Sequence, residues 1–233
     1  MTSLRTRLAS LLALPLLAAA ALSGCSGGET SDTATPREVL AAAKQQLDET
    51  SGVRVGLSTE KLPPGVSGLL DAQGVGTHAP AFEGDITVAA SGVTVDAQVV
   101  AVAGQVHAKL PFTTAFRPID PATYGAPDPA DLMRPDGGLS SLLTAAEKIQ
   151  AGKQVREGKA VLRSYTATVP GTAVAAVIPS ADATATFSAV FTVADDDRLA
   201  TAVLSGPFYP DADSVTYTVT FADYGTATTI TAP

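Results

Sequence analysis

The stretch ATATFSAVFTV, residues 183–193, alternates apolar and polar side chains along almost its whole length. Apolar residues occupy the odd positions, and Thr or Ser occupies every even position except Val190. A period of two is that of a β-strand, whose side chains point alternately to the two faces of a sheet. The stretch therefore predicts a sheet with one wet and one dry face, and the dry face needs a covering layer.

The same period recurs through the chain and predicts further strands. Val53, Val55 and Leu57 alternate with polar or small residues, and the pattern returns at Val215–Phe221. Turn signals such as Ser91-Gly92 indicate antiparallel hairpins. The predicted strands cover residues 53–58, 66–78, 82–90, 93–101, 106–110, 154–156, 161–169, 183–193, 199–205 and 215–221, with a short one at Ile230.

Helices are predicted at Arg37–Thr50, Leu139–Ile149 and Thr172–Val177. The first has a strong start signal, because Thr35 is a good N-cap, proline follows at the first helical position, and Glu38 completes a capping box. Residues 111–135 are dense in proline and can hold only short helical turns. These three helices are the elements that can cover the apolar face of the predicted sheet. The predicted fold is therefore α+β, an antiparallel β half-barrel covered on its concave side by helices.

The N-terminus has the layout of a signal peptide. Arg5 and Arg7 precede an apolar run from Leu8 to Leu22, which is shorter than the roughly 20 residues of a membrane span. The tetrad Leu22-Ser23-Gly24-Cys25 resembles the bacterial lipobox, in which the cysteine thiol receives a diacylglyceryl group and the peptide is cut before it. We expect the protein to be held at the extracytoplasmic face of the cell membrane by a lipid on Cys25.

A lone cysteine is often a small buried hydrophobic residue instead. Cys25 is the only cysteine, however, and it follows the apolar run directly, which favours lipidation. Disulfides and a cysteine nucleophile are then excluded from the mature domain. The expected organisation is a signal peptide at 1–24, a lipidated N-terminus and flexible tether at 25–35, and a single lipid-binding half-barrel domain at 36–233.

Composition narrows the possible partners. The net charge is −8, and loss of the two arginines at the N-terminus makes it more acidic, with 13 basic against 23 acidic residues. An acidic surface argues against nucleic-acid binding and against polybasic attachment to membranes. Tryptophan is absent and aromatic residues are few, so large side chains are scarce for filling a wide interior.

A family resemblance covers essentially the whole chain. The segments that carry it are Gly68–Ala72, Thr77–Pro80, Asp128–Leu132, Pro135–Leu139 and Gly206–Pro210, together with the tetrad ending at Cys25. On these segments the chain resembles the LppX/LprA/LprF/LprG lipoproteins of mycobacteria and their actinobacterial relatives, especially the LprG-like members. The resemblance implies a half-barrel that encloses a large hydrophobic cavity, and binding or transport of triacylated lipids and glycolipids bound for the outer envelope.

The resemblance also implies which residues line the cavity. They are Ile86, Val88, Val95, Ala97 and Val99 on two strands, Leu142 and Leu143 on a helix, and Phe187 and Phe191 on a later strand. Periodicity selects the same faces, but it does not distinguish a filled core from a cavity. His107 and Gln105 stand where relatives are expected to have aromatic and basic residues, so the headgroup preference is left open.

Catalytic and metal sites are not expected. Ser140 and Ser141 lie near glycines but not in a G-x-S-x-G nucleophile elbow. His78 and His107 are far apart and lack paired ligand spacing. Asp195–Asp197 lacks the alternating spacing of a calcium loop and is predicted to be a solvated hairpin turn. We expect no catalytic residues, no metal and no cofactor.

Four further aspartates lie in the proline-rich crossover, where aspartate commonly caps turns. They are Asp120, Asp128, Asp131 and Asp136. A minority interpretation places them at the mouth of the cavity, where they would meet a sugar headgroup or reject anionic ligands.

The sequence thus predicts carriage of an acylated lipid or glycolipid, without catalysis. Its expected partners are that ligand, the plasma membrane through the lipid anchor, and an export transporter as a further candidate. The alternative is a surface-interaction or envelope-assembly module with a filled core and no lipid cargo. A hydrolase is a distant third hypothesis.

Overall fold

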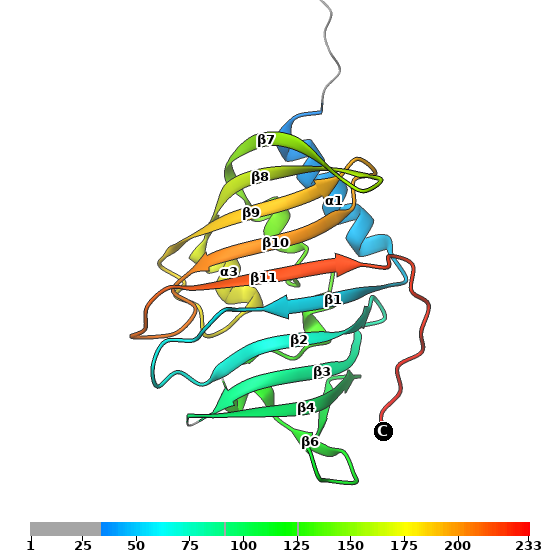
Figure 1. Cartoon of the computed structure of the whole chain (residues 1–233), viewed down its shortest axis with the longest axis vertical. Helices are drawn as coiled ribbons and strands as arrows, with labels where there is room; N and C mark the ends of the chain where they lie inside the picture. Colours follow the sequence, from blue (N-terminus) through cyan, green and yellow to red (C-terminus); the bar gives the residue numbers. More distant parts are fainter. Residues whose placement is uncertain (1–33, 91, 125) are drawn as a thin grey trace, which may run out of the picture. The chain divides into compact units, whose positions relative to one another are not determined.

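The computed structural model describes residues 34–90, 92–124 and 126–233, and residues 34–233 form one compact unit. The predicted signal peptide, Cys25 and most of the tether lie outside the described residues. One antiparallel sheet of eleven strands dominates this unit (Figure 1). The sheet is open, with β6 (Arg117–Ile119) and β7 (Glu147–Glu157) at its two edges. The helices described there are few, and none is long and apolar enough to cross a membrane.

Two meanders build the sheet, in the order β6-β5-β4-β3-β2-β1-β11-β10-β9-β8-β7. The antiparallel pairing of β1 with β11 joins them into one surface. The remaining strands are β1 (Gly52–Ser58), β2 (Gly68–Thr77), β3 (Ala81–Ala90), β4 (Val93–Val102), β5 (Gln105–Lys109), β8 (Ala160–Pro170), β9 (Thr186–Ala194), β10 (Leu199–Gly206) and β11 (Val215–Ala222).

The first helix, α1 (Pro36–Glu49), begins as the sequence predicts. The Thr35 hydroxyl accepts from the Glu38 backbone N–H, and the Glu38 carboxylate accepts from the Thr35 backbone N–H, which completes the capping box. Leu40, Ala43 and Leu47 form its buried stripe. The hydrophobic face of α1 therefore packs toward the sheet, as expected for an amphipathic helix.

The three α-helices among the described residues all pack against strands of the second meander. Contacts join α1 to β7, β9 and β10, while α2 (Ser141–Ala145) contacts β8 and α3 (Gly171–Val177) contacts β8 and β9. Figure 1 shows α1 and α3 on one side of these strands. We call that side the inner face of the sheet.

The first meander is covered differently. Its inner face carries a small cluster of Phe82, Val99, Ala101 and Val106, over which Ala130 of the proline-rich crossover packs. The described part of the crossover holds the 3₁₀ turns η1 (Pro121–Tyr124) and η2 (Asp131–Met133), as predicted, but it also holds the strand β6, which the prediction of helical turns alone for residues 111–135 excluded.

Two other secondary-structure predictions are wrong. Residues 139–149 do not form one helix, because α2 ends at Ala145 and Glu147 already begins the edge strand β7. Pairing with β8 satisfies the outer backbone groups of β8, and this outweighs the helix propensity of the segment. Ile230 is not in a strand; it is buried against Ala81 and Val100 on the outer face.

Candidate functional site

A single row of apolar residues crosses the inner face. Ala97 on β4 is opposite Ile86 on β3, which is opposite Ala72 on β2 and then Leu57 on β1. Across the central joint the row continues through Val219, Ala202 and Phe191 to Tyr165. The two meanders therefore share one continuous apolar surface. Predicted lining residues that are far apart in the sequence lie on this same face.

Part of this face is not covered. We call it the open apolar surface, and it consists of Leu57, Leu69, Ala72, Ile86, Val88 and Val95, each of them partly exposed. The pairs Ile86 with Ala72 and Val88 with Leu69 and Val95 place these side chains side by side. Three of the predicted lining residues are thus brought together where apolar area remains accessible.

Small residues next to this surface allow neighbouring groups to approach closely. Gly84 lies so near β2 that a Cβ built on it would be 2.2 Å from the Gln73 carbonyl oxygen, and one on Gly74 would be 2.6 Å from the Phe82 ring. At Gly76 the Met133 side chain occupies the space. Phe82 and Met133 therefore close the inner face at one end of β2 and leave its other end open.

The remaining predicted lining residues lie in packed surroundings. Ala97 and Val99 are 8% and 1% exposed, and Leu142, Leu143, Phe187 and Phe191 are between 0% and 2% exposed. The Phe187 ring packs edge-on against Phe208 at 5.0 Å between centroids, and Phe208 packs similarly on Tyr217 at 5.1 Å. The contact of these residues with a ligand stays a prediction.

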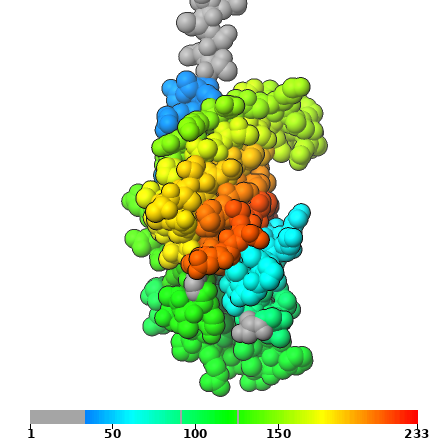
Figure 2. Space-filling model, turned by 90° about the vertical axis from the view of Figure 1, so that its left-hand side faces the viewer, coloured from blue at the N-terminus to red at the C-terminus, as the bar shows by residue number. Residues whose placement is uncertain are grey.

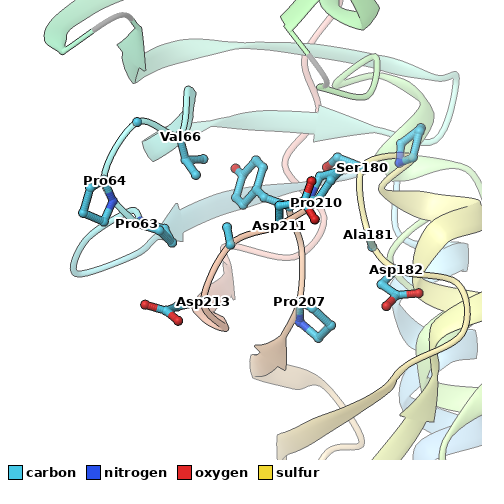
Figure 3. A pocket seen from close by; sticks show the side chains of 14 residues that line it. Pro63, Pro64, Val66, Ser180, Ala181, Asp182, Pro207, Pro210, Asp211 and Asp213 are labelled. Carbon is cyan, nitrogen blue, oxygen red and sulfur yellow. The ribbon is translucent and has the colours of Figure 1, made fainter.

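A cleft of about 1060 Å³ lies where three loops meet (Figure 3). Pro63–Val66 come from the β1–β2 loop, Pro179–Asp182 from the α3–β9 loop and Pro207–Asp213 from the β10–β11 connection. Figure 2 shows these three segments as neighbouring cyan, yellow and orange surfaces. The cleft was not predicted from the sequence, although the proline and aspartate content of the three loops was a signal for it.

Tyr209 connects the cleft to the sheet. It lines the cleft, and its hydroxyl oxygen lies 2.7 Å from that of Tyr217 on β11. The Tyr217 hydroxyl donates to the Leu69 carbonyl oxygen at 2.9 Å, so the proton between the two tyrosines comes from Tyr209. Burial raises the pKa of both hydroxyls, which therefore stay protonated. Tyr209 in the lining of the cleft is thus linked through Tyr217 to the backbone of Leu69, whose side chain belongs to the open apolar surface.

The polar residues considered for catalysis serve local structure. Ser140 is buried, and its hydroxyl lies 3.4 Å from Lys44 Nζ. The Ser141 hydroxyl donates to the Gly138 carbonyl at 2.6 Å. Asp195–Asp197 form the β9–β10 turn, as predicted. Among the residues that the structure describes, no group of three or more His, Cys, Asp or Glu side chains could hold a metal ion.

The family model of the LppX_LprAFG lipoproteins matches residues 35–230, nearly the whole of the described unit. The chain belongs to the LppX_LprAFG lipoprotein family. It is also similar to the lipoarabinomannan carrier protein LprG of Mycolicibacterium hassiacum, with 31% identity over 241 aligned residues that cover 99% of each chain.

Two solved structures of LppX_LprAFG proteins share the fold. LprF from Mycobacterium bovis matches with a TM-score of 0.67 at 14% identity, covering 85% of this chain and 96% of LprF. LppX from Mycobacterium tuberculosis matches with a TM-score of 0.61 at 14% identity, covering 84% of this chain and 98% of LppX. At such low identity the similarity establishes the large open antiparallel sheet alone.

Proposed function

We propose that this lipoprotein binds the acyl chains of a lipid or glycolipid and carries it through the cell envelope without chemical change. The observation that carries the proposal is the open apolar surface on the inner face of the sheet, together with the cleft of about 1060 Å³ between the three loops. A relative with 31% identity over its full length is named a lipoarabinomannan carrier, which supports the same class of ligand.

The two parts of the site suit the two parts of a lipid. Acyl chains would lie along Leu57, Ile86 and Val88, where burial of each methylene contributes about 0.8 kcal/mol. One long chain would then gain on the order of 10 kcal/mol before the cost of ordering it. The polar headgroup would lie toward the cleft, where Tyr209, Asp182 and Asp211 offer hydrogen-bonding groups.

The cargo we propose is a triacylated lipid or glycolipid. To shelter several chains, the half-barrel would enclose them in a hydrophobic cavity between its concave side and its covering helices. The small side chain of Ala72 on this face leaves width for more than one chain. The predicted lining residues of the packed half, Phe187 and Phe191 among them, would then contact chains only after their neighbours move.

Membrane attachment is the second part of the proposal. A lipidated Cys25 followed by a tether to residue 35 would hold the single lipid-binding domain, residues 36–233, at the extracytoplasmic face. Two or more acyl chains on the anchor are needed for stable attachment. An export transporter is the partner we propose for receiving or delivering the cargo.

One observation favours the alternative of an interaction module without cargo. Beneath the helices the core is filled, since Phe187 and Phe191 are fully buried among other side chains. Such a module would use the acidic surface to meet a partner protein, and the apolar row would be only structural.

The deciding experiment is lipid analysis of the protein purified without its anchor. The mature domain lacking Cys25 is produced in an actinobacterium, and copurifying lipids are identified by native and denaturing mass spectrometry. A stoichiometric acylated lipid establishes carriage and names the cargo class. A lipid-free protein that also fails to bind added glycolipid refutes carriage and favours the interaction module.

A further inference from the structure

The loop between β5 and β6 holds an unusual turn. Both the backbone N–H and the hydroxyl of Thr113 donate to the Leu110 carbonyl oxygen, at 3.2 and 2.7 Å, and this closes a tight turn around Pro111 and Phe112. Phe112 has a φ of 66°, at the position where such a turn favours glycine. A bulky aromatic residue therefore occupies a backbone conformation that opposes it.

The Phe112 side chain gains no packing within the chain in return. Its exposed fraction is 107%, and that of Leu110 is 49%, so the turn presents an apolar tip to solvent. The base of the loop is fixed, because Phe116 packs against the cluster of Ala81, Val100 and Ile230. The tip thus projects from an anchored base.

The charge carried by the loop itself differs from that of the whole chain. Lys109 and Arg117 flank it, and no Asp or Glu occurs from Gln105 to Ile119, although the chain carries a net charge of −8. Lys109 Nζ lies 6.0 Å from the centre of the Phe116 ring. An apolar tip with flanking cations suits a surface that is apolar inside and anionic outside.

We propose that Leu110, Pro111 and Phe112 insert into the interfacial layer of a bilayer containing anionic phospholipid. The area that a convex turn of this size could bury is far smaller than the area that each partner buries in a stable protein interface, which is about 800 Å². Aromatic side chains, in contrast, are favoured at the membrane interface, where apolar burial and cationic neighbours act together.

The position of the tip connects it with the lipid site. A pocket of about 420 Å³ lies between the turn and β3–β4, and Ile86 and Ala97 contribute to its lining. The carboxylates of Asp85 and Asp96 also border it, and that of Asp96 accepts a hydrogen bond from the Thr87 hydroxyl at 2.8 Å. The inference rests on the proposed lipid carriage: the tip would bring the open apolar surface to the bilayer from which lipid is taken.

The absence of tryptophan allows a direct test. The lipidated protein carrying Phe112→Trp is reconstituted into vesicles of phosphatidylcholine and phosphatidylglycerol, with brominated phosphatidylcholine as quencher. Val155→Trp is the matched control, because Val155 is 56% exposed on the edge strand β7 at the other side of the sheet. We expect the emission of the Phe112→Trp variant to shift to the blue and to be quenched at least twofold, while the control keeps the emission of a solvated indole.

The outcomes distinguish insertion of the tip into a bilayer from lipid carriage. Unquenched, solvent-like emission from Phe112→Trp in a protein that copurifies with lipid overturns the membrane tip and leaves lipid carriage standing. Quenched emission in a protein that binds no lipid supports the tip and refutes carriage. A blue shift that occurs without vesicles and grows with protein concentration overturns the proposal in favour of self-association.

Discussion

The hydroxyl groups of Tyr209 and Tyr217 lie 2.7 Å apart, and the Tyr217 hydroxyl donates a hydrogen bond to the Leu69 carbonyl oxygen. Tyr209 lies in the β10–β11 connection, Tyr217 on β11 and Leu69 on β2. The pair therefore fastens a wall of the cleft to both meanders.

The Tyr217→Phe substitution is expected to lower the free energy of unfolding by about 1–3 kcal/mol, because it leaves the Leu69 carbonyl without this partner. Tyr209→Phe is the matched control and should cost less, since Tyr217 can still donate to Leu69. Urea unfolding followed by circular dichroism measures both. Equal losses for the two variants would show that the Leu69 hydrogen bond does not contribute separately.

Alkaline pH should destabilise the fold through the same residue. Burial raises the pKa of Tyr217 above its ordinary value of 10.0, so the unfolded chain loses this proton at a lower pH than the folded chain. The associated stability is present below pH 10.0 and is lost as pH rises above it, by up to about 1.4 kcal/mol per pH unit for one group. We expect a shallower decline above that pH in Tyr217→Phe. An unchanged slope in unfolding measured at several pH values contradicts this assignment.

The Ile86→Trp substitution is expected to obstruct the open apolar surface and to reduce lipid occupancy at least tenfold while the fold is kept. The larger ring would fill space between Ala72 and Ala97, which neighbour Ile86 in the row. Gln73→Trp is the matched control, because Gln73 is an exposed residue on β2 next to Ala72. Lipid occupancy is measured by native mass spectrometry. Equal occupancy in folded Ile86→Trp protein would remove Ile86 from the lipid site.

Truncation to alanine should distinguish residues of the packed core from residues of the open apolar surface by the loss of unfolding free energy. Phe187 is fully buried, so Phe187→Ala is expected to cost about 3–5 kcal/mol of unfolding free energy. Ile86 is partly exposed, and Ile86→Ala should cost less than about 2 kcal/mol because less apolar area is lost from burial. Chemical unfolding of the lipid-free variants gives both values. Similar losses would indicate that Ile86 is as tightly packed as Phe187.

The elements best predicted from the sequence are those defined by local chemistry. The capping box at Thr35 and Glu38 fixes the start of α1, and the alternation at residues 186–193 fixes both the strand β9 and its buried face. Each signal acts through neighbours a few residues away. For that reason neither depended on knowledge of the tertiary structure.

Pairing between distant segments was harder to predict. Residues 147–149 were predicted as the end of a helix but begin the edge strand β7, because β8 offers them unpaired backbone groups, whereas residues 154–156 of the same strand were predicted correctly. Two register shifts and a φ of 51° at Lys148 accompany this irregular pairing. The short strand β6 was missed for the same reason, since its partner β5 supplies the pairing.

The candidate site likewise has one part that could be predicted from the local sequence and one part that could not. The common face of Ile86, Val88 and Val95 follows from a period of two and is confirmed by the strand register. The cleft was missed because it is formed by three loops that meet only in the folded chain. Whether an apolar residue on a predicted face is covered also depends on distant segments, as when Met133 covers Gly76.

Mild acid should weaken the fold through His78, which follows β2 and lies near α1 and η2. Burial lowers its pKa below the ordinary value of 6.5, with the nearby Lys44 acting in the same direction, while the charge of Asp48 and the backbones of Met133 and Leu47 oppose the shift. The unfolded chain therefore takes up this proton at a higher pH than the folded chain. The stability is complete above pH 6.5 and is lost as the pH falls below it.

The expected result is a free energy of unfolding that falls between about pH 7 and pH 5, and a smaller fall in His78→Gln. His107→Gln is the matched control, because it makes the same change of side chain on β5, away from α1. Slopes are compared instead of absolute stabilities, since the substitution itself can destabilise the contact with α1. Identical slopes of unfolding free energy against pH in all three proteins would exclude His78 as the origin of the acid sensitivity. The carboxylates would then be the remaining candidates.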